Sequence, residues 1–360
     1  MAAVVLKIDT CLSLVADRAP RLRGEQLGSR LPAPFTFWNA FGLGQHFERH
    51  PHQPRALEQY SIAQLSRISH VDIPLFFEDV QLLLCGALQS TRTLIQAQRC
   101  ITQTDPATEC QQQAIIAGKL KLYHNELRRL RRGSSKGAND PGSRRKLMWI
   151  YTGKEESEDP GWQKTVELRL VSIERHTSLI ESLAGMNLFA DVQMLGARMT
   201  QAQTDAPESM QESARVFAWA GSSNGRMALL HAMAALIHFQ QGLPDQPIYT
   251  DIVSALAMTT ASIILYSWFG CIPYDNDSNG WGSAQPNISL DYIRQRTGDQ
   301  PPDDVMHWVK SGGSVAAIDG WQLGRKLYSQ HMASVLAKLK PVRDTWPLCE
   351  PFSAALEAQI

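Results

Sequence analysis

Apolar residues recur along most of the chain at the three- and four-residue spacing of an amphipathic helix. Met227, Leu230, Ala234 and Ile237 form one such stripe, which stops at Gln241-Gly242. Residues at this spacing share one face of a helix, and glycine is typical of the position just beyond a helix end. Only a few short runs could form strands, and we find no βαβ alternation that would build a parallel sheet. The pattern therefore predicts an all-α fold, an irregular multi-helix bundle.

Two polar stretches interrupt this helical pattern. Residues 133–160 and 273–304 are rich in Gly, Pro, Asn, Asp and Ser, a composition that indicates long surface loops. No repeat of solenoid type is present. A chain of 360 residues, 44% of them hydrophobic, can bury a large core. We therefore predict a single all-helical domain over residues 1–360, with helical blocks at 3–132, 161–270 and 305–358.

Residues 252–272 contain no charged side chain and are numerous enough to span a bilayer. The segment nevertheless contains several Ser and Thr residues and lacks basic flanks, which favours a helix buried in a protein core. At the start of the sequence, Lys7 and Asp9 stand where a secretory signal needs apolar residues. We expect neither membrane insertion nor export.

Charge and cysteine content exclude several classes of function. The chain has 35 basic and 35 acidic residues, so no overall field attracts it to nucleic acid or to an anionic membrane. Its six cysteines are scattered and form no C-x-x-C pair of the kind that zinc sites and redox motifs use. They indicate a reducing compartment, the cytosol or the nucleus. We predict no cofactor.

One segment matches a catalytic motif. Residues 221–225 fit G-x-S-x-G, in which a strained turn between a strand and a helix exposes a nucleophilic serine, here Ser223. Such a turn needs a sheet of several strands, and the sequence predicts no such sheet. A Gly/Ser/Asn cluster between two helices is also ordinary turn chemistry. We favour the turn and keep a serine hydrolase as the alternative.

Three groups of potential metal ligands are incomplete. Residues 275–286 copy the first half of a calcium-binding loop, but Pro286 stands where a bidentate Glu should be. His46 and His50 would share a helical face, yet no second ligand cluster completes four-coordination. Asp303 begins an acidic pair like the one that holds magnesium in helical terpene cyclases, but the third acidic residue of that motif is missing. Asp303 is better explained as a helix cap. The sequence therefore predicts no metal site.

Two basic clusters have the layout of a bipartite nuclear-import signal. A polar spacer separates them, and such a signal acts as an extended peptide. The alternative is a solvated, positively charged helix end that complements the helix macrodipole. The sequence leaves both interpretations open. The clusters consist of Arg128, Arg129, Arg131, Arg132, Arg144, Arg145 and Lys146.

Several short motifs follow one another along the chain. Residues 9–40 contain an Asp, a Leu-Ser pair, a proline turn, a Leu-Pro and a Trp-x-Ala. Residues 227–232 contain a His-Ala pair, residues 254–270 form an alanine-spaced apolar run, and residues 288–291 and 305–312 contain a Leu-Asp followed by Trp-Val-x-x-Gly. In this order, the segments resemble the C-terminal helical regulatory region of fungal zinc-finger transcription factors, a middle-homology-type domain. The nearest likeness is to factors with two-Cys two-His fingers.

This resemblance implies a non-enzymatic regulatory domain that acts in the nucleus through other proteins of the transcription machinery. It implies no catalytic residues. Zinc ligands are absent, so contact with DNA is expected only through a segment that is not part of this chain. An apolar cavity for a small-molecule inducer is a further hypothesis. The alternative function is a fungal secondary-metabolism enzyme, either all-helical or a serine hydrolase that uses Ser223.

Overall fold

Helices make up most of the described chain, so the predicted all-α fold is confirmed. Contacts divide the chain into two compact units, Met1–Ala184 and Gly185–Ile360. Helix α8 (Trp162–Phe189) runs through this division, and the single-domain prediction stays a prediction. The computed structural model describes residues 2–26, 62–65, 75–100, 106–134, 147–148, 151–152, 160–201, 207–240, 251–271, 288–289, 301–312, 315–318, 321–322, 337, 340 and 354.

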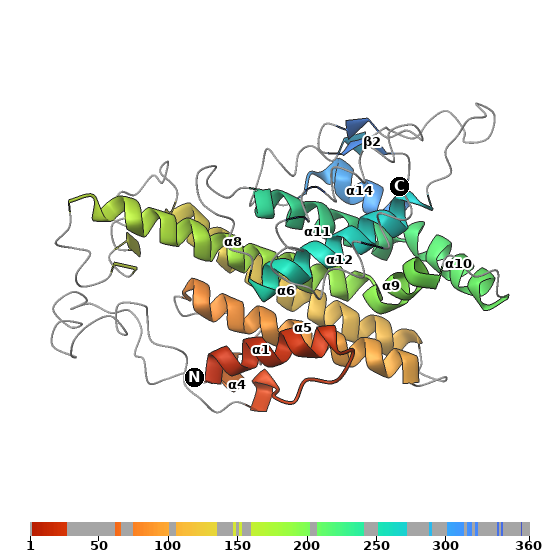
Figure 1. The fold of residues 1–360 in the computed structure, drawn as a ribbon, viewed down its shortest axis with the longest axis horizontal. Helices are drawn as coiled ribbons and strands as arrows, with labels where there is room; N and C mark the ends of the chain where they lie inside the picture. Colours follow the sequence, from red (N-terminus) through yellow and green to blue (C-terminus); the bar gives the residue numbers. More distant parts are fainter. Residues whose placement is uncertain are drawn as a thin grey trace. The chain divides into compact units, whose positions relative to one another are not determined.

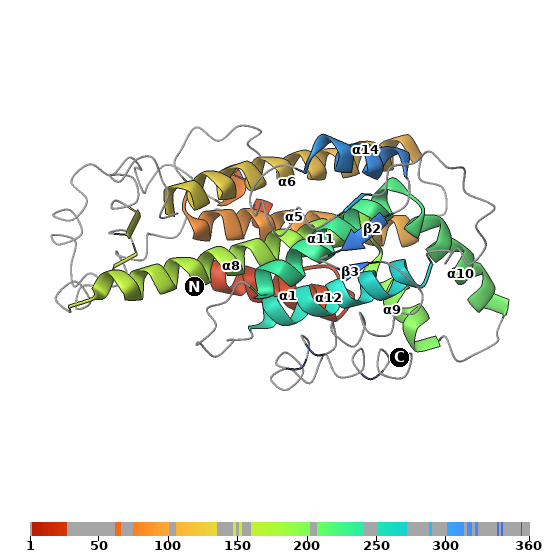
Figure 2. The ribbon, with the colours of Figure 1, turned by 90° about the horizontal axis from the view of Figure 1, so that it is seen from above.

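The first unit is built around the long helix α5 (Phe77–Cys100), which lies between α1 and α6 (Figures 1 and 2). Its leucines form much of the buried core. Asp79, in the first turn, accepts a hydrogen bond from the backbone N–H of Phe76 at 2.9 Å and so caps the helix start. The unit also contains α1 (Ala2–Val15), the 3-10 helix η1 (Gly24–Gln26), α4 (Ile62–Leu65), α6 (Pro106–Ser134) and most of α8.

Buried amide side chains cross-link this unit. Gln89 of α5 donates to the Thr10 hydroxyl of α1 at 2.9 Å and to the Leu22 carbonyl at 2.7 Å, and it accepts from the Gly24 N–H at 3.1 Å. Gln81 donates to the Thr177 hydroxyl of α8 at 2.9 Å. Buried polar groups cost stability unless they are hydrogen-bonded. The Gln89 bonds therefore fix α1 and the turn after it against α5, and the Gln81 bond joins α5 to α8.

The second unit contains a pair of adjacent helices, α11 (Ser223–Gln240) and α12 (Ile252–Phe269) (Figures 1 and 2). Asp251 caps α12, since its carboxylate accepts from the Ser254 N–H at 2.7 Å. Among the described residues, α12 alone is long and apolar enough to cross a membrane, and most of it is buried inside the protein, as predicted for a core helix. The unit also contains α9 (Val192–Gln201), α10 (Pro207–Ala220) and α14 (Asp303–Ser311).

Three short strands are present, and two of them lie in a segment that the sequence predicts to be helical. β1 (Ile288–Ser289) pairs in parallel with β2 (Val315–Ile318), and β2 pairs antiparallel with β3 (Trp321–Gln322). Because α14 connects β1 to β2, the chain contains one small βαβ unit, and part of the predicted helical block 305–358 is strand. The β-branched Val315 and Ile318 suit a strand, and the sequence Asp319-Gly320 between β2 and β3 is typical of a two-residue hairpin.

The predicted loops also need correction at their edges. Helix α6 extends to Ser134, and α14 begins at Asp303, so the ends of the loops 133–160 and 273–304 are helical. Within the first stretch, Tyr151 is fully buried and packs against Phe77, with ring centroids 6.2 Å apart. Apolar residues there join the core of the first unit. Most of both stretches lies outside the described residues.

Candidate functional site at the corner of α10, α11 and α14

Residues 221–225 form a tight turn between two helices, as favoured from the sequence. The Ser222 hydroxyl accepts from the Gly225 N–H at 3.1 Å and donates to the Trp219 carbonyl at 2.6 Å. Ser222 is therefore the N-cap of α11. The residues before the turn belong to α10, not to a strand, so Ser223 does not occupy the strand-to-helix elbow of a hydrolase. It lies exposed in the first turn of α11.

The most unusual group at this corner is a buried arginine, Arg226, in the first turn of α11. Only 9% of Arg226 is exposed. Its Nε donates to the Val309 carbonyl of α14 at 2.9 Å, and its Nη1 donates to the Gly221 carbonyl at 2.7 Å. Its guanidinium carbon lies 6.0 Å from the centroid of the buried Trp308 ring, within reach of a cation–π interaction. Burial lowers the pKa of Arg226.

Carbonyl oxygens and an aromatic ring thus surround the charge of Arg226, and no carboxylate among the described residues pairs with it. Gly312 closes the site at the end of α14. Its φ is 82°, and its N–H donates to the Trp308 carbonyl at 2.8 Å. A Cβ at Gly312 would lie 3.4 Å from Arg226 Nη1 and would be strained at this φ. A glycine is therefore needed here, and Arg226 joins α11 to α14.

His231 of α11 makes a second close contact within the same unit. Its ring stacks on Phe189 with centroids 5.9 Å apart and an interplanar angle of 10°. A Cβ at Gly185 of α8 would come within 2.4 Å of the His231 ring, so the imidazole lies directly against the helix backbone. The arrangement orients His231 through packing. The sequence singles out this residue through the resemblance alone.

The first basic cluster lies on the last turns of α6. Arg129 pairs with Glu126 at 2.9 Å and donates to the Leu75 carbonyl at 3.3 Å. Arg131 pairs with Glu174 of α8 at 3.2 Å and donates to the Ser178 hydroxyl. Part of the cluster thus contributes to the packing of the first unit. Arg128 is half-buried and Arg132 is exposed, whereas Arg144, Arg145 and Lys146 lie outside the described residues. Nuclear import stays a prediction.

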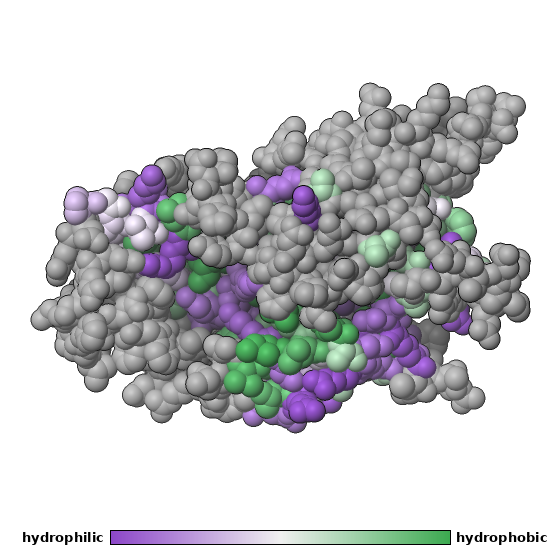
Figure 3. Space-filling view, in the orientation of Figure 1, coloured by the Kyte–Doolittle hydropathy of each residue, from purple (hydrophilic) through white to green (hydrophobic). Residues whose placement is uncertain are grey.

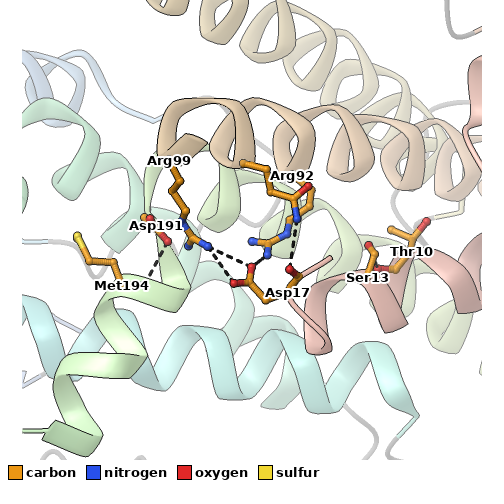
Figure 4. Close-up of polar contacts among 8 residues, drawn as sticks. Thr10, Ser13, Asp17, Arg92, Arg99, Asp191 and Met194 are labelled. Atoms are coloured by element: carbon orange, nitrogen blue, oxygen red, sulfur yellow. Dashed lines mark hydrogen bonds and ion pairs between the residues drawn. The ribbon is translucent and has the colours of Figure 1, made fainter. Parts of the chain in front are cut away.

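Three polar contacts in the first unit were not predicted from the sequence. Asp17, at φ 49° beyond the end of α1, pairs with Arg92 and with Arg99, whose Nη1 lies 3.0 and 3.1 Å from the two carboxylate oxygens (Figure 4). Tyr151 donates to Glu78 at 2.7 Å, and burial raises the pKa of the Glu78 carboxyl. The partners are far apart along the chain, so no local sequence pattern could have indicated these contacts.

No group of three or more His, Cys, Asp or Glu residues in the described part of the chain could hold a metal ion. The candidates His46, His50 and residues 275–286 lie outside that part, and Asp303 is exposed at the start of α14. The described helices define an all-α protein. No protein-family model, curated protein or solved structure matches the chain.

Proposed function

We propose that this chain is a non-enzymatic transcriptional regulatory domain of the fungal transcription-factor type. It acts in the nucleus through contacts with other proteins of the transcription machinery, and it reaches DNA only through a segment outside this chain. The proposal rests on the resemblance of ordered sequence segments. The proteins to which these segments are similar are the fungal zinc-finger transcription factors.

One contact supports this proposal more than the others. The segments 227–232 and 305–312, which carry two of the family-like patterns, belong to α11 and α14, and Arg226 hydrogen-bonds to Val309 between these helices. The third such segment forms most of α12, which packs against α11. Residues that are separate in the sequence thus form one helical core, as a shared domain would require.

A reporter assay tests the proposal. The full chain is fused to a heterologous DNA-binding domain in a fungal host, and transcription from a reporter is compared with that of the DNA-binding domain alone. A regulatory domain changes the output in either direction. The variant Arg226→Met should reduce the effect, because α11 loses its hydrogen bond to the Val309 carbonyl of α14 and its bond to the Gly221 carbonyl. The control is Lys310→Met, at an exposed position of α14. A fusion with no effect on the reporter contradicts the proposal.

Two further measurements test nuclear import and the absence of enzyme activity. Neutralising both basic clusters should abolish nuclear accumulation of a tagged chain, whereas Lys119→Gln/Lys121→Gln on α6 should not. The enzyme alternative predicts that a fluorophosphonate labels the wild type and not Ser223→Ala. We expect no labelling of either protein, and a label that depends on Ser223 would contradict a non-enzymatic role.

A further inference from the structure

Helix α1 has apolar side chains on two faces: Leu6 and Leu14 are buried in the core, and a second apolar row is exposed. Asp9, Thr10 and Ser13 are buried against the first unit. The exposed fractions are 41% for Val5, 48% for Ile8, 40% for Leu12 and 37% for Val15. A surface helix normally has polar residues on the face opposite its buried apolar stripe, so a second, exposed apolar row is unusual. We call these four exposed residues the α1 stripe.

The spacing of the α1 stripe fits a helical partner. Its members are three, four and three positions apart, so they form a single row along one helix face. Figure 3 shows apolar atoms gathered over α1, with hydrophilic side chains beside them. A row one side chain wide matches the seam of a pair of helices. A membrane contact would instead need a broad apolar surface.

Positive charge lies next to the α1 stripe. The backbone N–H of Leu22 donates to the Asp9 carboxylate at 2.9 Å, so the chain after α1 turns back along the helix. This places Arg21 and Arg23 alongside the middle of α1, and Arg18 follows its end. All three arginines are exposed, and no acidic side chain among the described residues pairs with them.

We propose that the α1 stripe and these arginines bind an amphipathic helix of a partner protein that carries acidic residues beside its apolar row. The apolar rows pack together, and the acidic residues meet the exposed guanidinium groups, as in helix-in-groove recognition. The inference uses only contacts and exposure in the first unit. It does not depend on the proposed regulatory function.

Fluorescence anisotropy with the purified full chain tests this binding. The probe is a labelled synthetic helix with leucines at the same three- and four-residue spacing and glutamates at the flanking positions. The double variant Ile8→Gln/Leu12→Gln should weaken binding at least about tenfold, because burial of each apolar side chain contributes that order of affinity. Ile115→Gln/Val171→Gln, at side chains that are 54% and 41% exposed, is the matched control and should leave the affinity unchanged.

Charge-reversal variants measure the electrostatic contribution to binding separately from the apolar contribution. Replacing Arg18, Arg21 and Arg23 with Glu should weaken binding and reduce its dependence on salt, whereas Lys119→Glu/Lys121→Glu on α6 should do neither. Because all the altered side chains lie at the surface, circular dichroism should show unchanged helix content and melting. If the double Gln variant does not fold, Ile8→Ala/Leu12→Ala replaces it.

Four results would overturn the inference: no binding of the acidic helix, binding that survives loss of the α1 stripe, preferential binding of phosphatidylserine vesicles through the same residues, or a dimer in sedimentation that Ile8→Gln/Leu12→Gln dissociates. The last two outcomes would assign the stripe to a membrane or to a second copy of the chain. A failed reporter assay with intact peptide binding would reject only the proposed function.

Discussion

The substitution Gly225→Ala tests whether the corner between α10 and α11 depends on the absence of a side chain. A Cβ at this position would lie 2.2 Å from the Trp219 carbonyl oxygen and 3.0 Å from the Ala220 Cα. These are main-chain atoms at the end of α10, and the same carbonyl accepts the Ser222 hydroxyl. No side-chain rotation can relieve the clash, so the two helices must move apart.

The expected loss follows from two opposing effects. Forcing extra atoms into a packed site costs typically about 1–3 kcal/mol, and the upper end applies here because backbone must move. Alanine in a helix recovers up to about 1 kcal/mol relative to glycine. We therefore expect Gly225→Ala to lower the free energy of unfolding by about 2 kcal/mol. Gly221→Ala is the control, since its Cβ would meet nothing closer than the Phe217 carbonyl at 3.6 Å.

Urea titration followed by circular dichroism measures both variants. At a typical m-value, a loss of about 2 kcal/mol moves the midpoint to lower urea by about 1 M. The Gly221→Ala midpoint should stay within about 0.3 M of the wild type, or rise slightly. Equal midpoints for Gly225→Ala and the wild type would refute the reasoning. So would an equal loss in the two alanine variants, because the close approach would then not be the cause.

Three other substitutions have clear expectations. Gly185→Ala should lower the free energy of unfolding by about 1–3 kcal/mol, because the new Cβ would clash with the His231 ring. Adding His231→Ala should restore part of this loss in melting experiments. Unchanged stability of the Gly185→Ala single variant would contradict this expectation. Gly118→Ala, at an exposed helical site with no atom within 4 Å, should raise stability by about 0.5–1 kcal/mol, and a lower melting temperature would contradict the expectation. Burial raises the folded-state pKa of Glu78, so the contribution of this carboxyl to stability is present at low pH and is lost as the pH rises through that pKa. Glu78→Gln, which can still accept from Tyr151, should therefore gain on the wild type as the pH rises above the ordinary glutamate pKa, and a constant difference in urea midpoint would refute this.

The helices could be predicted because their signals are local. The stripe from Met227 to Ile237 lies within α11, and the uncharged segment 252–272 coincides with the buried α12. Proline at the first helical position indicates the start of α6 at Pro106. Each of these signals depends on side chains within one or two turns of each other, so periodicity is sufficient.

The contacts of the candidate site could not be predicted in the same way. The Arg226–Val309 hydrogen bond joins residues 83 positions apart, and the Tyr151–Glu78 bond joins residues 73 positions apart. No pattern of spacing relates such partners. The β2–β3 pair is different, since Asp319-Gly320 between two short apolar runs is a local hairpin signal. The strand pair is therefore predictable from local sequence, and the helical prediction for this part of residues 305–358 is wrong.

Amphipathic spacing also identifies two helix faces without saying which one is buried. In α1 the buried face contains Leu6 and Leu14 together with polar side chains, which are buried at low cost because each has a partner. The Thr10 hydroxyl donates to the Leu6 carbonyl and the Ser13 hydroxyl to the Thr10 carbonyl, both at 2.7 Å, while the Asp9 carboxylate accepts from the Leu22 N–H. Gln89, far along the chain, then fixes this face inward. The buried leucines and the long-range bond from Gln89 together hold this face inward, and they leave at the surface an apolar row that gains stability only when another helix covers it.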